Sequence, residues 1–152
     1  MTARRRIALV AMAGSAAALI TSSTRPRDVR ASEAAQQRIT VLYQNFPNPF
    51  PTPASATTCL WFDLSASGDV TLAVYDLRGH LVRTIVPSAQ IKGFLDAGSY
   101  GRLNVAANSG CDPNFSWDGR ASDGSTVPPG VYLARLQAGG HWQTRKIVFR
   151  GP

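Results

Sequence analysis

Apolar and polar residues alternate along much of the chain after residue 40, and this period of two predicts β-strands. In the segment 58–64, Leu60, Phe62 and Leu64 fall on one face, and the residues between them fall on the other. Further strand-like segments lie at residues 41–43, 70–74, 81–86, 115–117, 131–136 and 144–150. No helical period appears after residue 31. The pattern predicts an all-β domain of about seven antiparallel strands packed as a β-sandwich.

Turn-forming residues separate the predicted strands. The segment 76–79, Asp-Leu-Arg-Gly, is typical of a hairpin turn in which Gly79 takes a left-handed conformation. Further turn signals stand at residues 118–119, 123–124, 128–130 and 138–140. The alternate prolines of 46–51 exclude a helix and predict an extended edge segment.

The stretch between the predicted strands 81–86 and 115–117 has few β-branched residues. Its apolar residues, which follow no regular period, are Ile91, Phe94, Leu95, Leu103 and Val105. The sequence therefore predicts an inserted loop at 88–114. Loops of this length in compact domains are usually functional or disordered.

Residues 1–23 have the pattern of an export signal, because three arginines precede an apolar run from Ile7 to Ile20. As a helix, this run spans about 21 Å, short of the roughly 30 Å core of a bilayer. We interpret it as an apolar helical leader, either a cleaved signal peptide or an uncleaved anchor in which residues 4–24 contact the membrane. Residues 24–40 are expected to form a flexible linker, and residues 41–152 the domain.

Positive charge is concentrated near the N-terminus. Of the formal net charge of +7, residues 1–31 carry +5, from six arginines and one aspartate. Residues 32–152 hold ten basic and eight acidic side chains and carry only +2. The composition therefore argues against a nucleic-acid partner.

The chain contains two cysteines, Cys59 and Cys111. An exported protein meets an oxidising compartment, where a disulfide is expected. The bridge would close a loop of about 50 residues and stabilise the fold by roughly 4 kcal/mol on the chain-entropy model. Since Cys59 lies on the face opposite Leu60, the bridge is expected to fasten the end of the inserted loop to the outside of the sheet.

Four motifs occur in order along the chain: LYQNFPNPF at 42–50, VYDLRG at 74–79, WDGR at 117–120 and PGVY at 129–132. Together they resemble the FlgD-type immunoglobulin-like domains and the related C-terminal sorting domains of the type IX secretion system. The resemblance covers about residues 41–150. It implies an immunoglobulin-like sandwich that serves as an accessory or assembly module or, in the sorting branch, as a secretion address on a larger cargo.

The resemblance implies structural roles for the motif residues. These are Asn45, Phe46, Pro47, Asn48, Pro49, Gly79, Trp117, Asp118, Gly119, Gly130 and Tyr132. The chain departs from the family in its long insertion with Cys111, and in having only a leader and linker before the domain. Both departures favour a stand-alone binder over a sorting signal.

No pattern of catalytic or metal-ligating residues emerges from the sequence. His80 and His141 stand in turns without a nucleophile motif beside them. The spacing of Asp112, Asp118 and Asp123 matches no calcium loop. We therefore expect no enzyme activity, no cofactor and no small-molecule substrate.

The inserted loop is expected to supply partner specificity, because loops on a rigid scaffold carry recognition. The candidate contacts are Ile91, Phe94, Leu95, Tyr100 and Leu103. In the alternative interpretation, these residues fold back and cover an edge strand.

The sequence thus predicts a non-catalytic module, an extrinsic accessory subunit that binds protein partners in a cell-envelope membrane assembly of photosynthetic, respiratory, secretory or flagellar kind. It would lie in the periplasm, at the periplasmic face of the inner membrane or at the cell surface. One alternative is a secretion-sorting or surface-attachment domain with its signal at 146–150. Another is a carbohydrate-binding accessory that stacks sugars on Trp61, Trp117 or Trp142.

Overall fold

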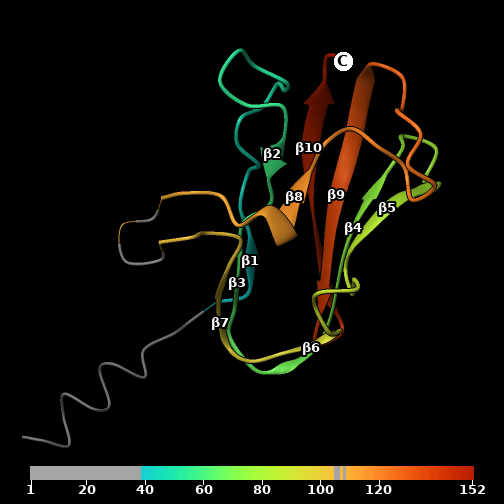
Figure 1. Cartoon of the computed structure of the whole chain (residues 1–152). Coiled ribbons are helices and arrows are strands. Elements are labelled where there is room, and N and C mark those ends of the chain that lie inside the picture. Colours follow the sequence, from blue (N-terminus) through green and yellow to red (C-terminus); the bar gives the residue numbers. More distant parts are fainter. Residues whose placement is uncertain (1–38, 105–106, 108) are drawn as a thin grey trace, which may run out of the picture. The chain divides into compact units, whose positions relative to one another are not determined.

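The computed structural model describes residues 39–104, 107 and 109–152 (Figure 1). The predicted leader at 1–23 lies outside the described residues, as does the predicted linker except for Ile39 and Thr40. The described part is all-β, as the alternation predicted, and its one helical element is the 3-10 turn η1 (Pro113–Phe115). No helix in that part is long and apolar enough to cross a membrane.

The larger sheet has the antiparallel order β10-β9-β4-β5. Its strands are β4 (Gly68–Tyr75), β5 (Leu81–Val86), β9 (Gly130–Ala138) and β10 (His141–Phe149). The predicted turn at 76–79 joins β4 to β5, and Gly79 has a φ of 85° in the left-handed region. Short β6 (Phe94–Leu95) pairs with the start of β4. These strands form one layer in Figure 1.

The smaller sheet has the order β1-β3-β7, and a separate pair joins β2 to β8. The bounds are β1 (Val41–Leu42), β2 (Thr58–Cys59), β3 (Phe62–Leu64), β7 (Gly98–Tyr100) and β8 (Ser116–Trp117). The single strand predicted at 58–64 is therefore two strands. The chain changes partners at Leu60, whose amide donates to the carbonyl of Phe115 at 2.8 Å before β3 joins β1 and β7.

The prediction of a loop throughout 88–114 is wrong, because β6 and β7 lie within this stretch. β6 extends the larger sheet beside β4, and β7 forms an edge of the smaller sheet beside β3. Strands of two and three residues are too short to produce a detectable period. β6 and β7 form only because they pair with β4 and β3, which lie elsewhere in the sequence.

Side chains from both sheets meet in one core. Leu60, Phe62 and Leu64 all face it, as the alternation predicted. The larger sheet contributes Val70, Leu72, Val74, Ile85, Val86, Tyr132, Ala134, Leu136, Ile147 and Phe149. The described domain is therefore a two-layer β structure with a shared interior.

Trp117 stands at the centre of an aromatic cluster. Its side chain is 1% exposed, and its ring centroid lies 5.5 Å from that of Phe50, 5.1 Å from Tyr132 and 5.9 Å from Phe149. The indole Nε1 donates to the carbonyl of Arg120 at 2.9 Å, so burial leaves no polar atom of this side chain unpaired. Residues of three sequence motifs thus meet at one point.

The Asn-Pro segment closes the free edge of β10. The side chain of Asn48 donates to the carbonyl of Lys146 at 2.9 Å and accepts from the amide of Val148 at 2.8 Å. Phe50 continues this pairing through its backbone, donating to Val148 at 3.0 Å and accepting from Arg150 at 2.7 Å. An amide side chain replaces a strand along residues 146–150, and this part of the edge is not left open for pairing with another chain.

The start of the same segment is fixed by Asn45, which is 2% exposed and donates to Thr58 Oγ1 at 2.7 Å. Thr58 in turn donates to the carbonyl of Pro47 at 2.7 Å. Phe46 behaves differently: its backbone pairs with Cys59, but its side chain is 66% exposed. In the predicted edge segment 46–51, the side chain of Phe50 is therefore buried in the core and that of Phe46 is not.

The remaining motif residues shape the turns around β9. Asp118 accepts from the amide of Arg120 at 3.1 Å, and the hydroxyl of Tyr132 donates to the carbonyl of Pro128 at 2.6 Å. Gly130 begins β9, and Gly119 has a φ of 77°. A Cβ on Gly119 would lie 2.3 Å from the ring of Phe149, so two independent reasons require glycine there.

Gly119→Ala should lower the free energy of unfolding by about 3 kcal/mol, the sum of a left-handed backbone penalty and a clash with the aromatic cluster. Gly124→Ala is the matched control, since Gly124 has a φ of 85° with nothing within 4 Å of a built Cβ. It should lose about 1 kcal/mol. Urea unfolding measures both. Equal losses would show that the cluster tolerates the added methyl group.

Candidate partner-binding surface

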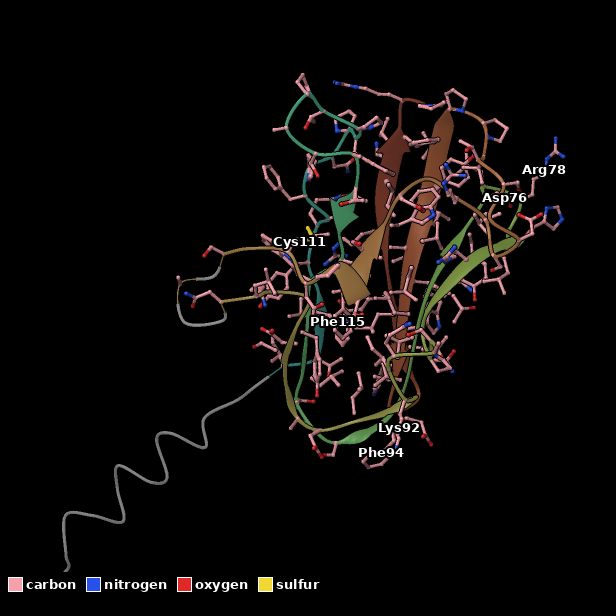
Figure 2. The ribbon with its side chains drawn as sticks, viewed as in Figure 1. Asp76, Arg78, Lys92, Phe94, Cys111 and Phe115 are labelled. Carbon is pink, nitrogen blue, oxygen red and sulfur yellow. A yellow bond between two sulfur atoms is a disulfide. The ribbon has the colours of Figure 1, made fainter. Side chains whose placement is uncertain are left out.

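The five residues predicted to contact a partner divide into two groups. Ile91, Leu95 and Tyr100 are partly buried and pack against the core, as the alternative interpretation of the insertion expected. Phe94 and Leu103 are 60% and 69% exposed. Figure 2 shows Phe94 beside Lys92 at the end of the sheet where β6 lies. Only these two of the five side chains are available for a large contact.

The predicted disulfide between Cys59 and Cys111 is confirmed, with 5.7 Å between the two Cα atoms. It joins β2 to the end of the insertion. Cys59 is only 6% exposed, but it is not among the residues of the core cluster that includes Leu60, and Cys111 is partly exposed. The backbone of Phe46 pairs with that of Cys59 beside the bridge. The bridge fastens the end of the insertion to β2.

Arg102, within the insertion, is held between two aromatic rings on the outer face of the smaller sheet. Its guanidinium carbon lies 4.6 Å from the ring centroid of Tyr43 and 5.2 Å from that of Trp61. Its Nη1 lies 3.2 Å from Asp63 Oδ1, and the hydroxyl of Tyr43 donates to Asp63 Oδ2 at 2.6 Å. The Arg102 side chain is only 6% exposed, so this cluster is part of the fold.

The cluster shifts two pKa values. Burial raises the pKa of Asp63, but hydrogen bonds from Tyr43, Ser99 and Arg102, together with the charge of Arg102, hold it below its usual value. The same bond to Asp63 is the main reason that the pKa of Tyr43 lies above its usual value, and burial adds to the shift. The ionised carboxylate is therefore the stable form beside Arg102.

A second arginine is held in the same way on the outer face of the larger sheet. The guanidinium carbon of Arg135 lies 4.9 Å from the ring centroid of Tyr75 and 5.4 Å from that of Trp142. Trp142 is 67% exposed. Ion pairs among the described residues join Arg102 to Asp63 and Arg120 to Asp118, His80 contacts Asp76, and none of these pairs includes Arg135.

Strand register determines what else shares this face, because directly opposed residues point to the same side. Thr71, Gln137 and Trp142 form one row across β4, β9 and β10. Further rows add Ala73, Arg135 and Thr144, and then Tyr75, Leu133 and Lys146. The pairing of β4 with β5 has two register shifts, so it does not assign β5 residues to these rows. Asp69 pairs with Phe94, and so the insertion places Phe94 on the face that carries Trp142. We call these residues the outer face.

Sequence reasoning named Phe94 as a partner contact and Trp142 only as a possible platform for a sugar, and it missed Tyr75 and Arg135. The signal for Arg135 was its position between the inward-facing Ala134 and Leu136, which already implied an outward side chain. Its aromatic neighbours depend on the pairing of β9 with both β4 and β10. This register cannot be read from one strand alone.

The side chains considered for catalysis or metal binding form hydrogen bonds that hold turns. His80 Nδ1 lies 2.9 Å from Asp76 Oδ2, and Asp76 also accepts from the amides of Arg78 and His80 within the β4–β5 turn. These bonds, the backbone amide of His80 first, hold the pKa of Asp76 below its usual value. Among the described residues, no three His, Cys, Asp or Glu side chains cluster as a metal site would require.

The candidate acidic residues outside this turn also bond locally. Asp112 caps η1 by accepting from the amide of Asn114 at 3.0 Å. Asp123 accepts from the hydroxyl and the amide of Ser125, and these bonds hold its pKa below the usual value. Each carboxylate thus serves a turn, which is the common role of such residues.

An open groove of about 940 Å³ lies between the β3–β4 connection, the β9–β10 hairpin and residues 39–40. Its lining includes Ser67, Asp69, Gly139, His141 and Trp142. Trp142 therefore borders both the groove and the outer face. The other two tryptophans are poor platforms for a sugar, since Trp117 is in the core and Trp61 is partly buried beside Arg102.

Asp63→Asn should lower the free energy of unfolding near neutral pH by about 2 kcal/mol, because it leaves the buried Arg102 without its charged partner. Since the folded pKa of Asp63 is depressed, its contribution is present above the unfolded pKa of about 3.9 and is lost as pH falls through the folded pKa. Urea unfolding from neutral pH to pH 2 should show the two proteins converging in acid. The control Asp69→Asn alters an exposed carboxylate, and a loss as large as that of Asp63→Asn would contradict this role.

Replacing both Cys59 and Cys111 with alanine should lower the free energy of unfolding by about 4 kcal/mol, because the bridge limits the unfolded chain. Wild-type protein unfolded in reductant should show the same loss. The bridge also predicts no reaction with a thiol reagent when the protein is isolated from its native host without reduction. Labelling of both cysteines there would contradict it.

Of three comparisons of this chain with known proteins, only that with solved structures gave matches. No protein-family model matches it, and no curated protein matches its sequence. Among solved structures, it is similar to part of PorZ from Porphyromonas gingivalis, described as an essential bacterial surface component of the type IX secretion system. The identity is 14% and the TM-score 0.41, over 71% of this chain and 11% of PorZ.

A second similar structure is FlgD from P. aeruginosa, with 22% identity and a TM-score of 0.38 over 74% of this chain and 76% of that one. The two neighbours carry the names of the two systems in the resemblance, the type IX secretion system and FlgD. Similarity at this level carries no conclusion about activity or partners for this chain.

Proposed function

We propose that this chain is a non-catalytic structural or interaction module, an extrinsic accessory subunit that binds and stabilises a larger protein assembly of the cell envelope. The observation that carries the proposal is the outer face of the larger sheet, where exposed aromatic side chains stand on a rigid scaffold. Phe94 and Trp142 are 60% and 67% exposed, and strand pairing places both on that face. Large exposed apolar groups on one face are typical of protein contacts.

The scaffold supports this proposal because it holds the exposed side chains in place before a partner binds, so that little conformational entropy is lost on binding. Hydrogen-bonded strands carry Tyr75, Arg135 and Trp142, and β6 and the disulfide fix the insertion at both ends. A surface that is already ordered loses little conformational entropy when a partner binds. We take the architecture to be an immunoglobulin-like sandwich, as the four motifs imply.

Export is part of the proposal. A disulfide between Cys59 and Cys111 is stable in the periplasm or at the cell surface and is uncommon in the cytosol. The periplasmic face of the inner membrane fits an accessory subunit of a membrane assembly, and the cell surface is the alternative. We propose no catalytic role, since the acidic side chains and His80 that bear the candidate chemistry are bonded within turns.

In the alternative proposal, a secretion-sorting domain, the segment 146–150 would be a terminal signal. In this structure Ile147 and Phe149 are 0% and 3% exposed within the core. The segment therefore already has a structural role, which is sufficient to explain its apolar residues. Deleting it would unfold the domain and could not identify a signal.

Purification from detergent-solubilised membranes of the native host tests the accessory-subunit proposal. The chain is expected to co-elute with a larger membrane protein assembly in size-exclusion chromatography, and quantitative mass spectrometry should give a constant ratio to its partners across the peak. Deleting its gene should make that assembly less stable to detergent or heat. Recovery of the chain only as a free soluble monomer would contradict the proposal.

A further inference from the structure

We propose that the Tyr75–Arg135–Trp142 stack is the centre of the partner interface and binds a carboxylate side chain of an acidic segment in a partner protein. This inference rests on the proposed function, because it identifies the surface and the chemistry through which the accessory subunit would be held. Tyrosine, arginine and tryptophan are the three residue types most enriched among interface positions that dominate binding energy.

The two rings position Arg135 without neutralising it. They lie 4.9 and 5.4 Å from its guanidinium carbon, and no ion pair among the described residues includes it. In this part of the chain the Nε atoms of Arg135 and Arg102 are both buried without a hydrogen-bond partner. Arg102, by comparison, is held by two rings and also by Asp63. The two arginines thus share one kind of aromatic support, and among the described residues only Arg102 forms an ion pair with a carboxylate.

The comparison identifies the ligand that Arg135 lacks. A guanidinium group offers a rigid set of donors that matches the two oxygens of a carboxylate, and stacking on aromatic rings reduces the entropy lost when such a bond forms. In the outer face, Lys146 adds a second positive charge, in the row next to Arg135. Asp69 is the only acidic residue of this face and pairs with Phe94 at its far end.

Apolar neighbours complete the surface and favour a protein over a free anion. Leu133, in the row next to Arg135, is partly buried, and Trp142 and Phe94 expose large apolar areas on the same face. A partner segment that combines an acidic side chain with apolar residues would cover them together. Such a contact excludes water from the Arg135 pair, which strengthens the charge interaction.

The test uses the full chain expressed in its native host. Arg135→Gln should weaken binding to the assembly by about thirty-fold, the loss expected when a dominant interface residue is truncated. Arg135→Lys keeps the charge but not the paired donors, and it should fall between wild type and Arg135→Gln. Arg78→Gln is the matched control, because Arg78 is exposed in the β4–β5 turn and belongs to none of the outer-face rows; Figure 2 labels it. It should bind as wild type does. Thermal unfolding of each purified variant separates loss of binding from loss of fold.

Zero-length carbodiimide crosslinking then identifies the carboxylate. The chain has two lysines, Lys92 and Lys146, so its intermolecular amide bonds to acidic side chains are few and easily assigned. In the native assembly, Lys146 should couple to an aspartate or glutamate of another protein, and Arg135→Lys should add a crosslink from position 135 to the same segment.

The outcomes separate this inference from the proposed function. If the chain does not co-purify with an assembly, the proposed function fails. If it co-purifies but folded Arg135→Gln binds as wild type does, or crosslinks join only Lys92, the outer face is not the interface and this inference alone is overturned. Binding to phosphatidylglycerol vesicles that requires Arg135, without protein crosslinks at Lys146, would replace the acidic protein segment with a membrane surface and would also overturn it.

Discussion

The packing around Trp117 is the interaction on which the rest of this structure depends. The ring contacts Phe50, Tyr132 and Phe149, which come from the Asn-Pro segment, β9 and β10. Those elements are distant in sequence, and their side chains become buried only when all three are in place. The same contacts set the position of β9 and β10, and with it the position of Arg135 and Trp142 on the opposite side of the sheet. The buried face therefore fixes the geometry of the exposed one.

Much of the fold follows from local sequence. The alternation at Leu60, Phe62 and Leu64 correctly gave the buried face, and the hairpin glycine and the cysteine pair were identified from residue type alone. The predictions were wrong where pairing with a distant strand decides the local structure. β6 and β7 are too short to show a period, and the switch of partners at Leu60 divides a strand that looks continuous in sequence.

The candidate site shows the same division. Phe94 was recognisable as an exposed aromatic residue in an insertion, but Tyr100 in the same insertion packs against the core. Nothing in local sequence separates them, because the pairing of β6 with β4 and of β7 with β3 decides which side chains turn outward. Arg135 and Tyr75 were missed because a cation between two rings is a property of three adjacent strands. In this protein, much of the scaffold can be predicted from local sequence patterns. The composition of the contact surface depends on the register in which the strands pair.

The central claim is that the outer face of the larger sheet is covered in the native assembly. Hydroxyl-radical footprinting measures this directly by comparing side-chain oxidation in the purified free chain and in native membranes. The account predicts strong protection of Trp142 and Phe94 in membranes, with unchanged oxidation of Leu77 and Leu103, which are 67% and 69% exposed but lie in the β4–β5 turn and the insertion away from the outer-face rows. Equal oxidation of Trp142 in both samples, or protection of Leu103 alone, would contradict it.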